Sequence, residues 1–408
     1  MNLISGSTPW PFTLPEAPVY PVLEKELSCE CLIIGGGVGG AISAYRLSRA
    51  GVDTVLIDKR KIAGGSTHAN TGLLQMLSDK SLTACMNTFG RQQGLLFYRL
   101  CRQGVDDILA LPDDLNIDPH IYRRSSLYYA SSEEDVGRLR TEYETLVQNG
   151  FRYEWRDEQE IASQFSFTKP AALYSKDDAE CNPYRMVHSL IARAAEHGAG
   201  VYEHTEALHC DYGSEEVICY TRCGTIRAKH VIFALGYETQ EWKKDRGAEL
   251  INTYAIATPP LQIDLKWHED ALIWETARPY LYFRLTADNR IVAGGRDEPM
   301  NEPQRREARM LSQCSELMNE VVKLFPETAG IRPEYQWGAV FGTTHDGLPL
   351  IGPHPRFPRC FFVEGYGGNG TVYSMIAARL LEDELAGRSG SSQGLELFSL
   401  TRTAKPSP

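Results

Sequence analysis

The 408-residue sequence has no apolar run approaching the ~18–20 residues that a membrane-spanning helix needs. Basic residues are in the minority, with 42 Lys and Arg against 53 Asp and Glu and a net charge of −11. Nucleic-acid binding depends on a basic surface, so we do not expect a nucleic-acid partner. The N-terminus also lacks the basic start and apolar core of a signal peptide, which favours a cytoplasmic location.

Clustered cysteines are missing too. The ten cysteines are scattered without a CxxC pair, so we expect reduced thiols and no metal site. Cys29 and Cys31 stand two apart in an expected strand and should share one face, but no second pair could complete four zinc ligands. No HExxH helix or Walker loop occurs. The chemistry must therefore come from another kind of motif.

The sequence does contain a βαβ unit near its start. A buried strand at 31–34 precedes a small-residue helix at 38–50 and a second strand at 54–57. A βαβ unit predicts a parallel sheet. Further αβ segments follow, at helix 183–198, strand 200–205, strand 230–235, strand 360–364 and helix 371–386.

Glycines join the first strand to the first helix. Gly35, Gly37 and Gly40 satisfy GxGxxG: the first allows a tight turn, the second a close approach to a pyrophosphate, and the third close helix packing. The helix start at Val38 and Gly39 offers free N–H groups to phosphates. Asp58 ends the second strand, where its carboxylate can accept hydrogen bonds from a ribose. The segment predicts dinucleotide binding; the alternative is a glycine-rich turn without a ligand.

The choice of dinucleotide depends on the next segment. Lys59 and Arg60 are compatible with a 2′-phosphate and hence NADP. However, residues 64–74 are small, polar and rich in glycine, as suits a loop whose backbone N–H groups run beside an isoalloxazine ring. We therefore expect FAD, with further contacts from Lys59 and from the loop residues Ser66, Thr67, Asn70, Thr71 and Gly72.

A second glycine motif, Gly365–Gly370, also stands between a strand and a helix. No further strand with an acidic end follows, so it is not a second dinucleotide-binding unit. The helix start can stabilise negative charge on the pyrimidine edge of a reduced flavin. The candidate contacts are Gly367, Gly368, Asn369, Gly370 and Thr371; a plain glycine-rich helix entry is the alternative.

The order of these motifs is informative. The Gly35–Gly40 fingerprint and the 65–74 loop are followed by Ala234-Leu235-Gly236, by Thr344–Gly352 and by the terminal Gly365–Thr371 segment. Over residues 29–387 the chain resembles the D-amino-acid oxidase, glycine oxidase and sarcosine oxidase family of FAD-dependent oxidoreductases. The resemblance implies additional FAD contacts at Ala207, Ala234 and Gly236.

The resemblance also implies the domain organisation. We expect an α/β, Rossmann-like FAD-binding domain with a parallel sheet, interleaved with an α+β substrate domain with an antiparallel sheet. The first domain would comprise 29–84, 151–245 and 336–387, and the second 85–150, which is rich in helix, and 246–335. The Pro-rich residues 1–28 would form an extended arm and 388–408 a C-terminal tail.

Residues 278–285 alternate strictly and form a hairpin with 290–296. Arg278, Tyr280, Tyr282 and Arg284 share one face, which can bind a carboxylate or can be a solvated sheet face. By the resemblance, Arg278 and Tyr280 are candidate catalytic residues facing the substrate, with Arg296 as a further candidate. We expect Arg284, next to the turn, to be solvated.

Several positions depart from the family pattern. Phe341 and Gly368 stand where relatives carry carboxylate-binding arginines, so the substrate clamp is not the usual one. Ala339 replaces a cysteine that attaches the flavin in the sarcosine oxidase group, which predicts non-covalent FAD. Val292 replaces a lysine linked to oxygen activation, so the electron acceptor stays open between O₂ and another carrier.

Two histidines complete the candidates. His68 lies in the flavin loop and could tune the flavin, although a structural histidine is the plainer interpretation. His345 precedes Asp346-Gly347 and is a candidate proton acceptor.

The predicted function is oxidation of a small amine or amino acid (a D-amino acid, glycine or an N-alkyl glycine) to an imine by hydride transfer to flavin N5. The alternatives are an FAD-dependent 2-hydroxy-acid dehydrogenase and a non-catalytic flavoprotein subunit. The sequence leaves open whether the protein is a homo-oligomer.

Overall fold

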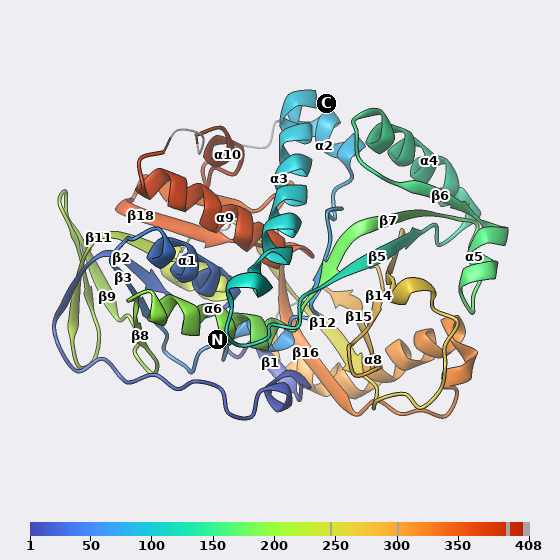
Figure 1. Ribbon diagram of the computed structural model, residues 1–408, viewed down its shortest axis with the longest axis horizontal. Coiled ribbons are helices and arrows are strands. Elements are labelled where there is room, and N and C mark those ends of the chain that lie inside the picture. The colour runs from blue at the N-terminus through green and yellow to red at the C-terminus, as the bar shows by residue number, and fades with distance from the viewer. Residues whose placement is uncertain (245–246, 300–301, 389–391, 403–408) are drawn as a thin grey trace.

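The computed structural model describes residues 1–244, 247–299, 302–388 and 392–402. Figure 1 shows two β-sheets side by side, each with its own set of helices, and α3 (Arg91–Leu109) standing where the two halves meet. The chain passes repeatedly between the two halves, so each sheet contains strands from distant parts of the sequence.

The first sheet has eight strands and is mainly parallel. Its strands β18, β11, β2, β3 and β8 run parallel, as the βαβ unit predicts. In spatial order the sheet contains β17 (Leu350–His354), β18 (Phe357–Glu364), β11 (Thr225–Phe233), β2 (Leu27–Ile34), β3 (Thr54–Ile57) and β8 (Gly200–Tyr202). In addition, β10 (Val217–Tyr220) pairs with β11, and β9 (His209–Tyr212) pairs with β10.

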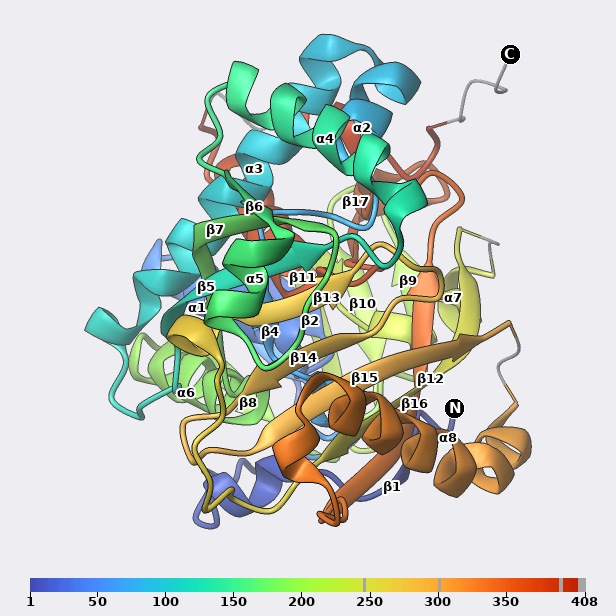
Figure 2. The ribbon, with the colours of Figure 1, turned by 90° about the vertical axis from the view of Figure 1, so that its right-hand side faces the viewer.

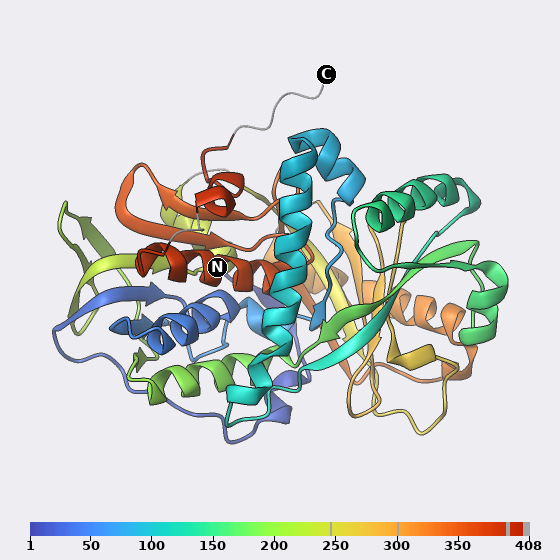
Figure 3. The same cartoon turned by 45° about the horizontal axis from the view of Figure 1, so that its top comes forward.

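Three helices lie side by side over one face of this sheet: α1 (Val38–Arg49), α6 (Pro183–Glu196) and α9 (Gly370–Leu385) (Figure 3). Their small and apolar residues make a close-packed layer with the strands. The carboxyl ends of β2 and β18 therefore lead directly into helix starts, the arrangement that both glycine motifs predict.

The opposite face of β2 buries a separate apolar cluster against β9 and β10. Cys31 belongs to the helix-covered cluster, whereas Cys29 belongs to this second one. The expectation that they share a face is wrong, because the N–H groups of Glu30 and Cys31 both donate to Asp53 O at 3.0 Å. Two residues opposite one acceptor form a bulge, which shifts the alternation of side chains by one residue.

The second sheet has ten strands and is mainly antiparallel. In order it contains β1 (Ile4–Gly6), β16 (Tyr335–Thr343), β12 (Glu249–Ala257), β15 (Ile291–Glu298), β14 (Tyr282–Leu285), β13 (Leu272–Glu275), β5 (Tyr122–Tyr129), β7 (Ala171–Glu180) and β4 (Leu73–Leu74), with β6 (Glu154–Asp157) beside β7. The amphipathic helix α8 (Pro303–Leu324) lies across one face of it, as Figure 2 shows, and buries an apolar core.

The remaining helices are short or peripheral. They are α2 (Leu82–Phe89), α4 (Glu133–Gln148), α5 (Glu158–Gln164), α7 (Thr239–Lys243) and α10 (Ser392–Leu397), with 3₁₀ turns η1 (Trp10–Thr13), η2 (Ser66–Ala69), η3 (Leu111–Asp114), η4 (Gly236–Glu238), η5 (His268–Asp270) and η6 (Pro326–Thr328).

Sheet membership differs from the division expected from the sequence. Strands β6 and β7, from segment 151–245, and β16, from segment 336–387, belong to the ten-stranded sheet. Strand β5 lies within the segment expected to be rich in helix. Its Arg123 and Arg124 interrupt the apolar pattern and pair with Asp177 and Glu180 of β7. Strand pairing of this kind depends on residues far away in the sequence.

Both chain ends also contain more structure than an arm and a tail. The N-terminal segment adds β1 to the edge of the ten-stranded sheet, where Ile4 pairs with Ala339. At the other end, α10 lies against α9, and Phe398 is fully buried. Burial of these apolar side chains holds both segments on the body.

Candidate functional site

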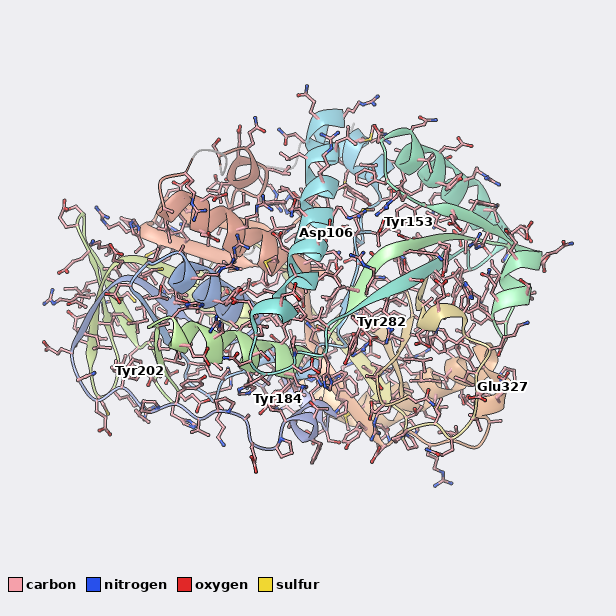
Figure 4. The ribbon with its side chains drawn as sticks, viewed as in Figure 1. Asp106, Tyr153, Tyr184, Tyr202, Tyr282 and Glu327 are labelled. Carbon is pink, nitrogen blue, oxygen red and sulfur yellow. The ribbon has the colours of Figure 1, made fainter. Side chains whose placement is uncertain are left out.

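A cavity of about 480 Å³ lies between the two sheets, lined by residues of both. We call one part the Asp58 end, formed by Gly35, Gly37, Val38, Gly39, Asp58, Arg60 and Glu238. We call the other part the Asp297 end, formed by Tyr237, Thr253, Tyr280, Tyr282 and Asp297. Figure 4 labels Tyr282 near the middle of the molecule, where the halves meet.

The first glycine motif is fixed by steric demands. Gly35 has φ +116°, and a Cβ there would lie 2.4 Å from the Ala234 carbonyl oxygen. A Cβ on Gly40 would lie only 1.8 Å from the Gly35 carbonyl oxygen, so α1 can approach β2 only with glycine at this position. Gly40 itself lies outside the cavity lining. The motif brings the N-terminus of α1 to the cavity with its N–H groups unpaired by the helix.

The Asp58 carboxylate stabilises the turn that follows β2, and it lines the cavity. Its Oδ2 accepts the N–H of Gly36 at 2.6 Å, and its Oδ1 accepts the N–H of Arg60 at 2.6 Å. Burial raises the pKa of Asp58, and these two hydrogen bonds oppose that shift. A carboxylate oxygen has more than one acceptor site, so Asp58 retains capacity for a ligand hydroxyl in the cavity.

The basic residues beside Asp58 share one carboxylate, that of Glu238. Lys59 Nζ lies 3.1 Å and Arg60 Nη2 2.8 Å from Glu238 Oε1. Although burial works against ionisation, these partners lower the pKa of Glu238 to about 2. The pair of cations that could suggest a 2′-phosphate therefore has a protein carboxylate as its partner.

The second glycine motif is tied to the loop after the first. Gly367 donates its N–H to Gly342 O at 2.8 Å, and Gly368 donates to Asp79 Oδ2 at 2.7 Å. The Asn70 side chain donates to Thr371 Oγ1 at 2.9 Å. The two segments that the sequence assigns to the flavin thus lie together, at the start of α9.

Most of the predicted cofactor contacts line the cavity. They are Gly35, Gly37, Val38, Gly39, Asp58, Lys59, Ser66, Thr67, Asn70, Thr71, Ala207, Ala234, Gly236, Gly367, Gly368, Gly370 and Thr371. Gly72 and Asn369 stand outside that lining. Gly72, with φ +80°, packs against the Cys181 carbonyl. The Asn369 side chain donates to the carbonyls of Gln75 and Leu77, and so supports the loop from behind.

The substrate-facing arginine is not where the alternation places it. Tyr280 lines the cavity, but Arg278 is exposed, and its Nη1 donates to the carbonyls of Glu275, Thr276 and Ala277. The regular strand begins only at Tyr282, so the row of alternating side chains does not extend back to Arg278.

The Arg284 side chain is buried, not solvated. Only 2% of it is exposed, and its Nη1 lies 2.9 Å from Glu180 Oε2. It also donates to Thr71 O at 2.6 Å and to Cys181 O at 3.1 Å. The expectation of a solvated side chain is wrong because the flavin-loop segment covers this face of the ten-stranded sheet. Arg284 instead fastens that loop to the sheet.

A bulge in β15 exchanges the sides of the sheet on which the Arg296 and Asp297 side chains lie. Ile291 and Ala293 point toward the core beneath α8, so strict alternation would send Arg296 to the cavity side. The pairing with β12 shifts between Asn252 and Tyr254, and Gly295 (φ +130°) and Arg296 (φ +57°) adopt the left-handed region. Arg296 therefore donates to Gln313 of α8, and Asp297 lines the cavity.

Asp297 was not singled out from the sequence. Burial raises the pKa of Asp297 to about 6; a hydrogen bond from Thr253 opposes this shift, and the charge of Asp79 adds to it. Asp297 forms no ion pair among the residues described. The available signal was the pair Gly294-Gly295 inside a strand, since glycines there often mark a bulge. The cavity residues Tyr237 and Tyr366 were also missed; each directly follows a glycine of a predicted motif.

Comparison with known proteins identifies the family. The model of the family described as "FAD dependent oxidoreductase" matches residues 30–384. The chain belongs to this family. It is 23% identical over 377 residues to the glycine oxidase of Bacillus subtilis (strain 168), covering 91% of this chain and 97% of the relative. It is also 23% identical to the gamma-glutamylputrescine oxidoreductase of Escherichia coli (strain K12), covering 90% and 86% of the two chains.

Among solved structures, the crystal structure of glycine oxidase from Geobacillus kaustophilus is similar, with a TM-score of 0.77 and 20% identity. The alignment covers 92% of this chain and 99% of that one. The expected α/β fold, with a mainly parallel sheet and an antiparallel-rich second sheet, is therefore confirmed. The family makes the protein an FAD-dependent enzyme of the amino-acid and amine oxidase kind.

The cavity fits the FAD that the family requires. At Gly35 and Gly40 a Cβ atom would clash with the main chain, so only glycine lets the turn take this shape. The start of α1 offers N–H donors, and Asp58 offers acceptors. Within the described ranges, no group of three or more His, Cys, Asp or Glu side chains could hold a metal ion, and no helix is long and apolar enough to cross a membrane.

The two candidate histidines do not line this cavity. The His68 ring packs edge-on against Tyr184 at 5.3 Å between centroids, and burial lowers the pKa of His68. His345 is half exposed, with Nε2 3.8 Å from Asp346 Oδ2. Of the five residues proposed as catalytic, the structure therefore brings Tyr280 alone to the cavity.

Proposed function

We propose that this protein oxidises a small amine or amino acid to an imine, with FAD bound non-covalently across the cavity. The arrangement that carries the proposal is one continuous cavity whose Asp58 end has nucleotide-binding features and whose Asp297 end is walled by polar and aromatic side chains. When bound, FAD supplies a two-electron acceptor for the substrate's C–H bond.

The protein residues divide the work between them. Gly35, Gly37 and the start of α1 would hold the pyrophosphate, and Asp58 the adenosine ribose. The Gly65–Leu74 loop and the Gly365–Thr371 segment would hold the flavin, and Arg284 keeps the first of these in place through the Thr71 carbonyl. These residues would hold the flavin beside the Asp297 end, where the substrate would bind.

Asp297 can accept the proton that the substrate ammonium must lose. An amine reacts as the neutral base, so its ammonium must first lose a proton to a nearby acceptor. The Asp297 carboxylate, with its raised pKa, is the carboxyl group that lines this end of the cavity within the described chain. The tyrosines around it exclude water and limit the positions that the substrate can take.

Two features support non-covalent attachment. Ala339 lines the cavity without a thiol, and the His68 ring is engaged with Tyr184. Heat or acid denaturation should release intact FAD into the supernatant, which absorbance and chromatography would identify. Flavin that stays with the precipitated protein would contradict this part of the proposal.

The decisive experiment is anaerobic reduction of the purified yellow protein. Glycine, sarcosine, D-amino acids, cyclic imino acids and simple amines are added in turn, and bleaching of the flavin absorbance is followed. Bleaching by an amine or amino acid supports the proposal. Bleaching by 2-hydroxy acids alone would favour the dehydrogenase alternative, and no bleaching by any compound would favour a non-catalytic flavoprotein.

A further inference from the structure

The Asp297 end of the cavity is aromatic on its walls. The Tyr237 and Tyr366 rings stack with centroids 5.6 Å apart, and those of Tyr280 and Tyr282 lie 6.1 Å apart at an angle of 51°. All four tyrosines line the cavity. The electron-rich faces of phenol rings attract cations. The walls therefore suit a positively charged group better than an anion.

The charge at this end is negative. Asp297 lines it without a cationic partner in the described chain. Asp79 lies close by, because a Cβ on Gly368 would lie 2.8 Å from Asp79 Oδ1 and 2.5 Å from the Tyr280 hydroxyl oxygen. Burial, followed by the charges of Asp79 and Asp297, raises the pKa of the Tyr280 hydroxyl. Two carboxylates thus act on one tyrosine.

The arginines near this end lie outside the cavity lining. Arg278 donates to backbone carbonyls with its guanidinium 5.1 Å from the Tyr280 ring centroid, Arg284 pairs with Glu180, and Arg296 turns to Gln313. Among the described residues that line the cavity, the basic ones are Lys59 and Arg60 at the other end, both paired with Glu238. A substrate carboxylate would meet Asp297 without a cation to compensate, which is unfavourable in a partly buried site.

We propose that the Asp297 end binds the cationic nitrogen of an amine that carries no carboxylate beside it. This substrate class rests on the proposed amine or amino-acid oxidation. Asp297 supplies the ion pair, and the Tyr282 ring supplies a cation–π contact. The β15 bulge is the specificity device, because without it Arg296 would face the cavity in place of Asp297.

The test compares two probes that share a benzyl group and differ in charge. Benzyltrimethylammonium cannot form an imine, and phenylacetate carries a carboxylate instead of the cation. Each is titrated into the FAD-loaded protein, and binding is followed by the perturbation of the flavin spectrum and by the shift in melting temperature. We expect the dissociation constant of the cation to be at least tenfold lower than that of phenylacetate. Equal or tighter binding of phenylacetate would overturn the inference.

Variants connect the preference to the residue. Asp297→Asn should raise the dissociation constant of the cation at least tenfold and leave phenylacetate binding unchanged or stronger. Asp264→Asn, an exposed carboxylate outside the cavity lining, is the matched control and should change neither. An unchanged cation affinity in folded Asp297→Asn would overturn the assignment. If that variant does not fold, the comparison of the two probes on the unmodified protein still decides.

The outcome is separable from that of the proposed function. Flavin reduction by amino acids but not by simple amines would overturn the inference and leave the proposed function intact. Reduction by simple amines would support both. If no compound reduces the flavin, the proposed function fails, while the titrations still show whether this end prefers a cation.

Discussion

The two ends of the cavity are built in different ways. The Asp58 end is mainly backbone, with glycines that no other residue can replace and a helix start. One side chain, the Asp58 carboxylate, is held by two backbone N–H groups. The Asp297 end is made of side chains on strands of the ten-stranded sheet and the segments beside them. A backbone site recognises features common to one cofactor, whereas a side-chain site can change its ligand by exchanging a few residues.

The difference also appears in how tightly each end is packed. An added Cβ on Gly40 would strike the main chain of Gly35 at 1.8 Å, whereas a Cβ on Gly294 would strike the Tyr282 hydroxyl at 2.1 Å. Main chain cannot move aside, but the tip of a tyrosine can. Gly40 should therefore tolerate almost no change, whereas Gly294 should tolerate substitution with altered ligand preference.

The largest effect should come from breaking the Asp58 end. Gly40→Ala places a Cβ against the Gly35 carbonyl and should cost at least ~4 kcal/mol, enough to give insoluble or flavin-free protein. Gly137→Ala, in open space on α4, is the control and should stabilise the protein by up to about 1 kcal/mol. Yield, flavin content and urea denaturation measure both. A soluble yellow Gly40→Ala protein would contradict the steric account.

Arg284 supports the Asp297 end from outside the cavity lining, because it joins β14, which carries Tyr282, to the flavin loop and to Glu180 of β7. Arg284→Met leaves a buried carboxylate with one arginine fewer and should destabilise the protein by roughly 3–5 kcal/mol. The half-exposed pair of Arg227 and Glu216 is the control, and Arg227→Met should cost less than about 1 kcal/mol. Similar urea midpoints for the two variants would show that burial of Arg284 contributes little.

Asp58 tests cofactor retention with less effect on the fold. Asp58→Ala removes charged hydrogen bonds of ~1.5–3 kcal/mol each, so the dissociation constant for FAD should rise tenfold or more. Asp58→Asn keeps an acceptor and should lie between the two. Equilibrium dialysis against free FAD measures all three. An unchanged dissociation constant would mean that Asp58 serves only the turn at Gly36.

The smallest effect should be the pH dependence at the Asp297 end. Asp297 titrates near 6 in the folded protein and near 4 when unfolded, so the folded state binds more protons between these values. Stability therefore falls as pH rises through this window. Asp297→Asn should be more stable than the unmodified protein by about 1–3 kcal/mol at pH 7.5, with no gain at pH 4.

Melting temperatures of both proteins across this range provide the measurement. Comparing the two removes the contribution of Asp178, a buried carboxyl whose pKa burial also raises to about 6. If Asp297→Asn raises the stability equally at pH 4 and pH 7.5, then ionisation of Asp297 does not destabilise the folded protein.

Local sequence by itself determined the parallel half of this protein. The βαβ unit with α1 and β3 follows from contacts between residues close in the sequence, where spacing decides geometry. The glycine motifs and their order are read directly from the sequence. The amphipathic period of helix α8 is local in the same way. The family and its cofactor could be inferred from these segments alone.

Only the tertiary structure decided which side chains face the substrate. Alternation along a strand is reliable until one bulge inverts it, and the bulge in β15 depends on the hydrogen bonds to β12. It exchanged Arg296 for Asp297 and so replaced a basic candidate with an acidic one. Burial of Arg284 likewise depends on the flavin loop crossing its face, a contact between residues about 200 positions apart. Such long-range pairings set the charge of the site, and local spacing carries no record of them.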